Sequence, residues 1–306
     1  MTEDVVIQVN QLSKRFGGIK AVNDITFQVN RGDVFGFLGP NGAGKTTTMG
    51  MLLGLIQPSS GDGSILGNSI LEDQHIIKPK IGAIIENPSF YPYMSGIDNL
   101  KAMFYASGLK PDINIIKENL AMVGLGERAK SKFKTYSLGM KQRLGLAAIL
   151  ITNPEIIFLD EPNNGLDPAG QKEIRDLILN LVKTQNKTVF ISSHQLMEVE
   201  KICNRVAVIQ KGNIIKSGSM KELLSTDQGV YMQVQNTEKA IKLLQSINVI
   251  AEISTERNFN LFAQVSFESI PEAIKTLMDG TCLVYAVEPY KLSLEDLFLE
   301  LTKVKK

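Results

Sequence analysis

A glycine-rich run near residue 40 carries the strongest chemical signal in this chain. It reads Gly-Pro-Asn-Gly-Ala-Gly-Lys-Thr-Thr and contains the phosphate-binding pattern of Gly, four residues, then Gly-Lys-Thr. Glycines let the backbone N–H groups point toward one anion, and the following helix adds the positive end of its dipole. Lys45 is expected to reach the β- and γ-phosphates of a nucleotide, and the Thr46 hydroxyl to hold Mg²⁺, unless the run is only a turn that binds nothing. The predicted nucleotide-binding residues of the run are Gly39, Asn41, Gly42, Ala43, Gly44, Lys45, Thr46 and Thr47.

A pair of carboxylates follows a second apolar run. Residues 156–159 read Ile-Ile-Phe-Leu, and Asp160 and Glu161 come directly after them. A short continuous apolar run is typical of a parallel strand that is buried on both faces, and such a strand ends at the sheet edge where phosphates bind. At that edge Asp160 is suited to bind Mg²⁺, and Glu161 is suited to orient and deprotonate an attacking water. The alternative is an ordinary strand end that leads into a turn.

Two polar residues stand where helices are predicted to begin. Ser137 precedes an amphipathic run, and Asp167 precedes Pro168, a residue that favours the first position of a helix. Each side chain can simply cap its own helix. The helix start at Ser137 and Gly139 can also present N–H groups to the γ-phosphate of a nucleotide. The residues alone leave both readings open.

A histidine follows another predicted strand. The chain has two histidines, and His194 comes after Ser192 and Ser193 at the end of an apolar run. Taken alone, such a histidine is most simply a loop residue. Its position after the carboxylate strand favours instead a polar contact with the γ-phosphate.

These residues require alternating strands and helices to bring them together. An apolar strand at 34–38 precedes the glycine-rich run and a helical rhythm follows it, as the pattern requires. We expect one domain over residues 1–220, with an inserted, mostly helical subdomain at about 88–153. Its other predicted elements are antiparallel strands at 5–9 and 25–29, a helix at 174–182, a strand at 188–192, and a closing hairpin of 205–209 with 214–216.

A second, smaller domain is predicted over residues 225–306. Its alternating and helical patterns follow the order β-α-β-β-α-β, which is the ferredoxin-like order of an α+β domain. A tail helix is predicted to begin at Ser293, with Asp296 as its capping-box partner. No group of residues in this domain suggests catalysis.

Composition limits the class of protein. The chain has 306 residues, enough for two domains, and 33 basic against 32 acidic residues give a net charge of +1, which does not favour nucleic acid as a partner. No apolar stretch approaches the roughly 20 residues that span a bilayer, and the first residues lack the pattern of a secretory signal. Cys203 and Cys282 lack metal-ligand spacing, so we expect buried, reduced thiols, as in a cytosolic chain.

In this order, the motifs make residues 1–220 resemble the nucleotide-binding subunit of an ABC transporter. Residues 39–46 are similar to its Walker A motif, 156–160 to Walker B and 137–142 to its signature motif. The resemblance implies a P-loop NTPase cassette of the α/β class, with a mixed sheet core, an antiparallel β subdomain and an inserted helical subdomain. It also implies that Glu161 is the catalytic carboxylate. Three further roles follow from it: a D-loop at Asp167, a switch histidine at His194 and an adenine-stacking aromatic ring at Phe16.

The resemblance further implies partners and place. Two such domains sandwich two ATP molecules head to tail, so that Ser137 and Gly139 of one copy contact the γ-phosphate held by Lys45 of the other. A separate membrane permease is implied as the other partner, which would hold this chain at the cytoplasmic face of the cell membrane. ATP and Mg²⁺ are the expected cofactors.

Two motifs depart from the family pattern. Leu138 and Met140 stand where the signature usually has glycine and glutamine, although Ser137 and Gly139 are kept. Glu86 stands where a glutamine is expected; a carboxylate can accept Mg²⁺ but cannot donate an amide hydrogen bond. Such a glutamate, the Phe-Tyr-Pro run after it and the C-terminal helix are similar to bacitracin-resistance and lantibiotic-immunity exporter subunits. Export of a peptide antibiotic is therefore expected, with a drug, a lipid or a polysaccharide as alternative cargo.

An aromatic cluster follows Glu86. It consists of Phe90, Tyr91, Tyr93 and Met94. One hypothesis is that it receives a short helix of the permease; the other is that it forms a small core under a loop.

Two rival functions also remain, a soluble ABC ATPase outside transport and a regulatory module that does not hydrolyse ATP. The first rival is disfavoured because the chain has one cassette and no coiled-coil insertion, and the second because the predicted catalytic residues are intact.

Overall fold

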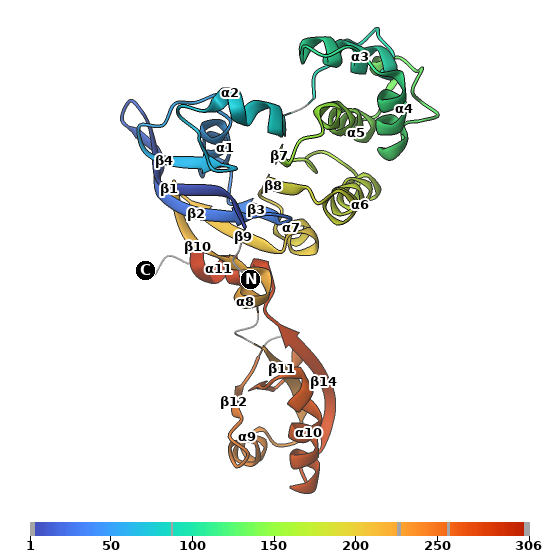
Figure 1. Cartoon of the computed structure of the whole chain (residues 1–306). Coiled ribbons are helices and arrows are strands. Elements are labelled where there is room, and N and C mark those ends of the chain that lie inside the picture. Colours follow the sequence, from blue (N-terminus) through green and yellow to red (C-terminus); the bar gives the residue numbers. More distant parts are fainter. Residues whose placement is uncertain (1–3, 87, 225–227, 256–257, 303–306) are drawn as a thin grey trace. The chain divides into compact units, whose positions relative to one another are not determined.

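The computed structural model forms two compact units, one ending at Ser219 and one beginning at Met220 (Figure 1). It describes residues 4–86, 88–224, 228–255 and 258–302. Each unit is described below by itself.

A six-stranded mixed sheet forms the centre of the first unit. Its order is β10-β9-β3-β8-β7-β6, and all neighbouring strands are parallel except the hairpin of β9 and β10. Every residue of β3, β7 and β8 is buried, as predicted for residues 156–159 of β7 from their continuous apolar run. The strands are β3 (Val34–Leu38), β6 (Ile81–Ile84), β7 (Ile156–Asp160), β8 (Thr188–Ser193), β9 (Arg205–Gln210) and β10 (Asn213–Ser219).

An antiparallel sheet packs against this mixed sheet. Its order is β2-β1-β4-β5, and its two long strands extend well beyond the predicted residues 5–9 and 25–29. The reason is that register shifts interrupt the pairing of β1 with β2 on both sides of Leu12, so the period-two pattern is lost while the strand continues. The strands are β1 (Val5–Phe16), β2 (Ile19–Asn30), β4 (Ser60–Ile65) and β5 (Asn68–Ser69).

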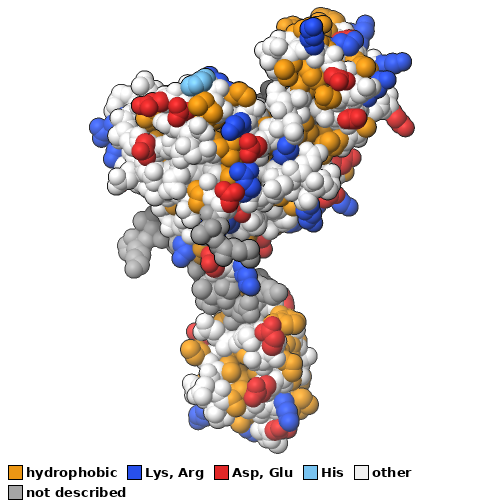
Figure 2. Space-filling model, viewed as in Figure 1, with side chains coloured by type: hydrophobic (Ala, Val, Ile, Leu, Met, Phe, Trp, Pro, Cys, Tyr) orange, Lys and Arg blue, Asp and Glu red, His pale blue; other side chains and the backbone are white. Residues whose placement is uncertain are grey.

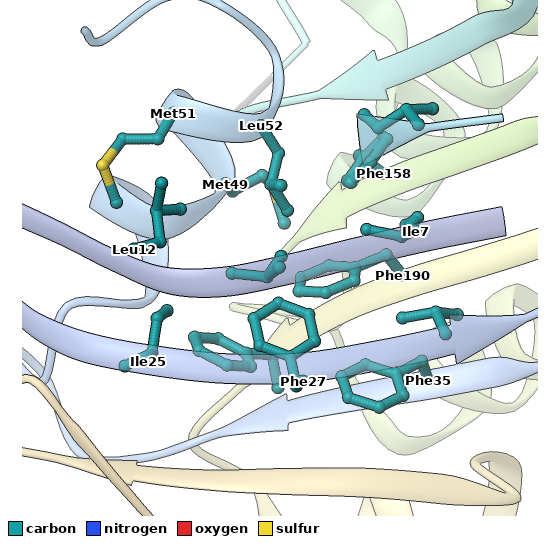
Figure 3. Close-up of a cluster of buried hydrophobic side chains, with 14 of the residues drawn as sticks. Ile7, Leu12, Ile25, Phe27, Phe35, Met49, Met51, Leu52, Phe158 and Phe190 are labelled. Carbon is teal, nitrogen blue, oxygen red and sulfur yellow. The ribbon is translucent and has the colours of Figure 1, made fainter. Parts of the chain in front are cut away.

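The core of the first unit lies between these two sheets. Figure 3 shows phenylalanine rings of both sheets packed together beside the helix that follows the glycine-rich run. Phe27 stacks on Phe35 with ring centres 5.6 Å apart, and Phe190 lies 5.4 Å from Phe158. Because this helix, α1 (Lys45–Leu52), buries Met49, Met51 and Leu52 in the same core, the glycine-rich loop is held firmly at the sheet edge.

Helices complete the first unit. A helical subdomain is inserted between β6 and β7, as Figure 1 shows, and consists of α3 (Gly96–Ala106), α4 (Ile113–Met122) and α5 (Leu138–Ile149). The remaining helices are α2 (Gln74–Ile77), α6 (Pro168–Gln185) and α7 (Leu196–Ile202), with single 3-10 turns at Lys78–Lys80, Phe133–Thr135 and Leu150–Thr152. The predicted amphipathic helix at 174–182 lies within α6, which buries Ile174, Leu177, Ile178 and Leu181.

The second unit contains a four-stranded antiparallel sheet with one helix after its first strand and one after its third. The sheet order β12-β13-β11-β14, with all neighbours antiparallel, is the ferredoxin-like arrangement that the sequence order predicted. Ser293 and Asp296 form the predicted capping box at the tail helix. The elements are α8 (Met220–Leu224), β11 (Gln228–Val234), α9 (Thr237–Gln245), β12 (Ile250–Ile253), β13 (Leu261–Gln264), a 3-10 turn (Phe267–Ser269), α10 (Ile270–Asp279), β14 (Val284–Lys291) and α11 (Leu294–Thr302).

Candidate active site

The loop between β3 and α1 encloses a hollow of about 200 Å³, here called the P-loop pocket. Two of its glycines have backbone conformations that side chains rarely adopt, with φ of 77° at Gly42 and 110° at Gly44. Its lining consists of Ala21, Asn41, Gly42, Gly44, Lys45, Thr46, Thr47 and Glu161. Six of the eight predicted residues of the run therefore line the pocket. Gly39 and Ala43 do not, and Ala43 is buried with 2% exposure.

Lys45 connects the loop to the predicted catalytic carboxylate. Its ammonium group, on a side chain only 6% exposed, donates to the carbonyl oxygens of Gly39 at 2.8 Å and Pro40 at 3.3 Å. The same Nζ lies 3.1 Å from Glu161 Oε1. The other oxygen, Oε2, lies 2.8 Å from His194 Nδ1. One carboxylate thus bridges the P-loop lysine and the predicted switch histidine.

A second polar chain runs beside the first. Thr46 Oγ1 donates to Asp160 Oδ2 at 2.9 Å, and Ser192 Oγ donates to the other carboxylate oxygen. The sequence pointed to Asp160 and Thr46 but assigned no role to Ser192. That residue reaches Asp160 because β7 and β8 pair in a register that places the two opposite each other. The neighbouring Glu161 adopts a left-handed backbone with φ of 50°, and its N–H donates to the Ser192 carbonyl at 3.1 Å.

A different hollow, the signature pocket, lies at the start of α5. It measures about 430 Å³ and is lined by Ser137, Leu138, Gly139, Arg143, Gly165, Leu166, Asp167, Ala169, Gly170 and Glu173. The three residues predicted from this part of the sequence, Ser137, Gly139 and Asp167, all contribute to it. Both predicted caps form, because Ser137 accepts from Met140 N at 3.2 Å and Asp167 accepts from Gly170 N at 3.0 Å.

Residues outside the predicted set shape the signature pocket. Leu138 packs so closely over Gly165 that a methyl group added there would meet its Cδ2 at 3.1 Å. Arg143 Nη2 lies 3.6 Å from Glu173 Oε2 and so links α5 to α6. Tyr136 is buried and donates to the Arg128 carbonyl at 2.8 Å, and this burial raises the pKa of the Tyr136 hydroxyl although the Arg128 charge opposes the shift. Arg143 follows Gly139 by four residues on α5 and so lies on the same helix face, which is the one sequence signal that could have pointed to it.

Phe16 and Glu86 stand apart from both hollows and from the polar chains that join Lys45, Glu161, His194, Thr46 and Asp160. Phe16 ends β1 with its ring 49% exposed, and Lys14 Nζ lies 5.0 Å from the ring centre. This exposure leaves a face of the ring available for stacking. Glu86 follows β6 with an exposed side chain and a φ of 61°. In the described part of the chain, Thr46 and Ser192 hydrogen-bond to Asp160, and Glu86 takes no part in these bonds.

Comparison with known proteins gives consistent relatives. A family model described as ABC transporter matches residues 22–164. The uncharacterized ABC transporter ATP-binding protein YhcH of Bacillus subtilis is 39% identical over 300 residues, which cover 97% of this chain and 96% of that protein. The bacitracin transport ATP-binding protein BcrA of Bacillus licheniformis is 41% identical over 78% of each chain. The lantibiotic transport ATP-binding protein SrtF of Streptococcus pyogenes is 40% identical over 69% of this chain and 89% of its own.

A solved structure of an ABC transporter component has a similar fold. The structure of cbiO1 from Clostridium perfringens, described as part of the ABC transporter complex cbiONQ, superposes with a TM-score of 0.66 at 27% identity. The match covers 80% of this chain and 97% of that one.

Proposed function

This chain belongs to the family of ABC transporter ATP-binding proteins, and from that premise we propose that its ATPase powers export of a bacitracin- or lantibiotic-type peptide through a separate membrane permease. The observation that carries the chemistry is the bridge of Glu161 between Lys45 and His194 at the P-loop pocket. The relatives named for bacitracin and lantibiotic transport support the class of cargo.

Each residue of the bridge has a proposed role in hydrolysis. The Lys45 ammonium and the loop N–H groups bind the β- and γ-phosphates, which requires Lys45 to exchange its contact with Glu161 for phosphate oxygens. Glu161, once released, orients a water and accepts its proton as the water attacks the γ-phosphate. His194 holds the carboxylate in place through Nδ1 and contacts the γ-phosphate.

The residues also fit Mg²⁺. Thr46 Oγ1 and Asp160 Oδ2 are hard oxygen ligands 2.9 Å apart at the mouth of the phosphate loop, and oxygen ligands are those that Mg²⁺ prefers. Bound there, Mg²⁺ would neutralise charge on the β- and γ-phosphate oxygens. Glu86, with its exposed side chain, remains a third proposed ligand.

Two copies are proposed to share each nucleotide. The P-loop pocket and the signature pocket have no lining residue in common within one chain. In a head-to-tail pair, Ser137 and Gly139 of one copy would complete the pocket around Lys45 of the other, with Asp167 at the boundary and Phe16 against adenine. The start of α5 supplies backbone N–H groups and a dipole suited to a γ-phosphate.

A groove on the helical subdomain is proposed to receive the permease. It measures about 400 Å³ and has no charged residue in its lining, which consists of Ser89, Phe90, Tyr91, Asn99, Ala102, Met103 and Ala106. Part of the aromatic cluster forms a small core, because Phe90 packs on Phe133 with ring centres 5.3 Å apart. Tyr91 is 62% exposed and so remains accessible to a partner, which supports the docking hypothesis. A short apolar helix suits such a groove. Through this contact the permease would hold the chain at the cytoplasmic face of the membrane. None of the helices in the described part of the chain has the length and hydrophobicity of a membrane span.

Reconstitution tests the proposal. The chain is co-expressed with its permease in a bacitracin-sensitive bacterium. Tolerance to bacitracin is expected to rise with the intact chain and to vanish with Glu161→Gln. If the cells became tolerant only to an unrelated drug, the peptide cargo would be wrong while the ATPase assignment would stand.

Replacing Met103 with Glu should abolish co-purification with the permease while ATP binding persists. If the Met103→Glu protein still co-purified with the permease at the normal level, the docking groove would be wrong.

A further inference from the structure

Two segments that are far apart in the sequence, one of them containing the 3-10 turn Phe133–Thr135, lie side by side on the helical subdomain. Phe133 N–H donates to the Met94 carbonyl at 2.9 Å, and Lys134 N–H donates to the Pro92 carbonyl at 3.0 Å. These backbone bonds fix the segment before the signature motif against the segment after β6. They therefore bring Lys134 close to Tyr93, and both side chains are exposed.

This surface combines lysines with an exposed tyrosine. Tyr93 is 75% exposed, and Lys134 Nζ lies 5.4 Å from the centre of its ring. Lys130 and Lys132 are also exposed and alternate with Lys134 along the chain. We call these four residues the lysine–tyrosine strip.

The charge of the helical subdomain differs from that of the whole chain. Residues 88–153 contain nine lysines and arginines against four aspartates and glutamates, a net charge of +5, whereas the whole chain has +1. Figure 2 shows lysine and arginine side chains among hydrophobic ones on this subdomain. Asp98, one of the acids, is already paired with Lys101 at 3.1 Å. The subdomain is thus a local cationic surface on a nearly neutral protein.

We propose that the lysine–tyrosine strip rests directly on anionic phospholipid headgroups. Clustered lysines are attracted to a negative membrane surface, and tyrosine places its ring at the headgroup level with its hydroxyl in water. The groove proposed for the permease has no charged lining residue, so the two surfaces suit different occupants. This lipid contact goes beyond the proposed function and depends neither on the cargo nor on the permease.

A single fluorescent reporter tests the contact. The chain contains no tryptophan, so Tyr93→Trp introduces one probe at the strip, and Tyr285→Trp introduces a control probe at a side chain 63% exposed in the second unit. Vesicles of phosphatidylcholine with added phosphatidylglycerol are expected to shift the emission of the Tyr93→Trp protein to the blue. Pure phosphatidylcholine vesicles should leave it unchanged, and Tyr285→Trp should not respond to either. Equal responses at both positions, or none at Tyr93→Trp, would overturn the proposal.

Charge removal tests the electrostatic part. In the Tyr93→Trp background, Lys130→Gln, Lys132→Gln and Lys134→Gln together should weaken partitioning into the anionic vesicles roughly a hundredfold, since each lysine near the surface contributes about fivefold. A matched control replaces three exposed lysines elsewhere in the first unit, Lys183, Lys211 and Lys216, with the same change in net charge and an expected effect below threefold. Equal losses in both triple variants would indicate attraction by net charge alone and overturn the strip. A blue shift that occurs only in vesicles carrying the permease would assign the strip to that protein instead.

Discussion

The P-loop pocket and the signature pocket differ in what their polar groups already do. In the P-loop pocket, Lys45 and Glu161 form an ion pair 3.1 Å long, and under the proposed function both change partners when phosphate binds. In the signature pocket, Ser137 caps its own helix and Arg143 is paired with Glu173, so little has to rearrange. Under the proposed function, one pocket performs the chemistry and the other only recognises phosphate. Substitutions in the two pockets should therefore have separable effects.

The largest effect is expected from Glu161→Gln. The amide keeps the size of the side chain but cannot accept a proton, so kcat should fall by about 10²–10⁴-fold while ATP still binds. The ATP-bound pair of copies should accumulate and elute as a dimer in size-exclusion chromatography. If Glu161→Gln released phosphate at the normal rate, another group would be the base, and the P-loop pocket would not differ from the signature pocket in the way described.

Mixing two inactive variants tests whether the pockets come from different copies. Lys45→Ala should weaken ATP binding by roughly ten- to a hundredfold, since it removes a charged contact to phosphate. Ser137→Ala should bind ATP in its own P-loop pocket but lower kcat. A mixed pair contains one site built from an intact P-loop pocket and an intact signature pocket, so mixing should restore part of the hydrolysis. Activity no greater than the sum of the two separate variants would contradict the shared site.

Substitutions at Ser137 separate capping from phosphate recognition. Ser137→Ala should lower the free energy of unfolding by about 1 kcal/mol through the lost cap. Ser137→Asp keeps a good cap but places a negative charge against the γ-phosphate, so its stability should stay near normal while hydrolysis falls. Urea unfolding and a phosphate-release assay measure the two quantities. If Ser137→Asp hydrolyses ATP as well as the unaltered chain, Ser137 is only a cap.

The smallest effect concerns the support of the signature pocket. Tyr136→Phe removes the hydrogen bond to the Arg128 carbonyl and should cost about 1 kcal/mol of unfolding free energy. Because burial raises the pKa of Tyr136 in the folded chain, its contribution is full below the unfolded value of 10.0 and is lost as pH rises through the folded value. The variant should therefore lose less stability than the original above about pH 10. Identical alkaline unfolding curves would show that Tyr136 does not stabilise this pocket.

Local patterns predicted much of the fold and of the candidate site. The buried strands, the glycine-rich loop, both caps and the ferredoxin-like order all depend on residues close in sequence. The lengths of β1 and β2 were wrong, because bulges hide a continuing strand from a period-two pattern. The sequence left open whether the aromatic cluster is a docking surface or a small core, and the structure divides it, because Phe90 packs against Phe133 and Tyr93 lies beside Lys134.

The sequence by itself determined which chemical groups are present and in what order, because a phosphate loop, a strand end and a helix cap are each set by a few neighbouring residues. Only the tertiary structure decided which groups meet. Ser192 reaches Asp160 through the register of β7 and β8, and Glu161 lies between Lys45 and His194 because three separate segments end at one sheet edge. Such contacts depend on strand pairing and core packing between residues far apart in the chain, and no local pattern encodes them.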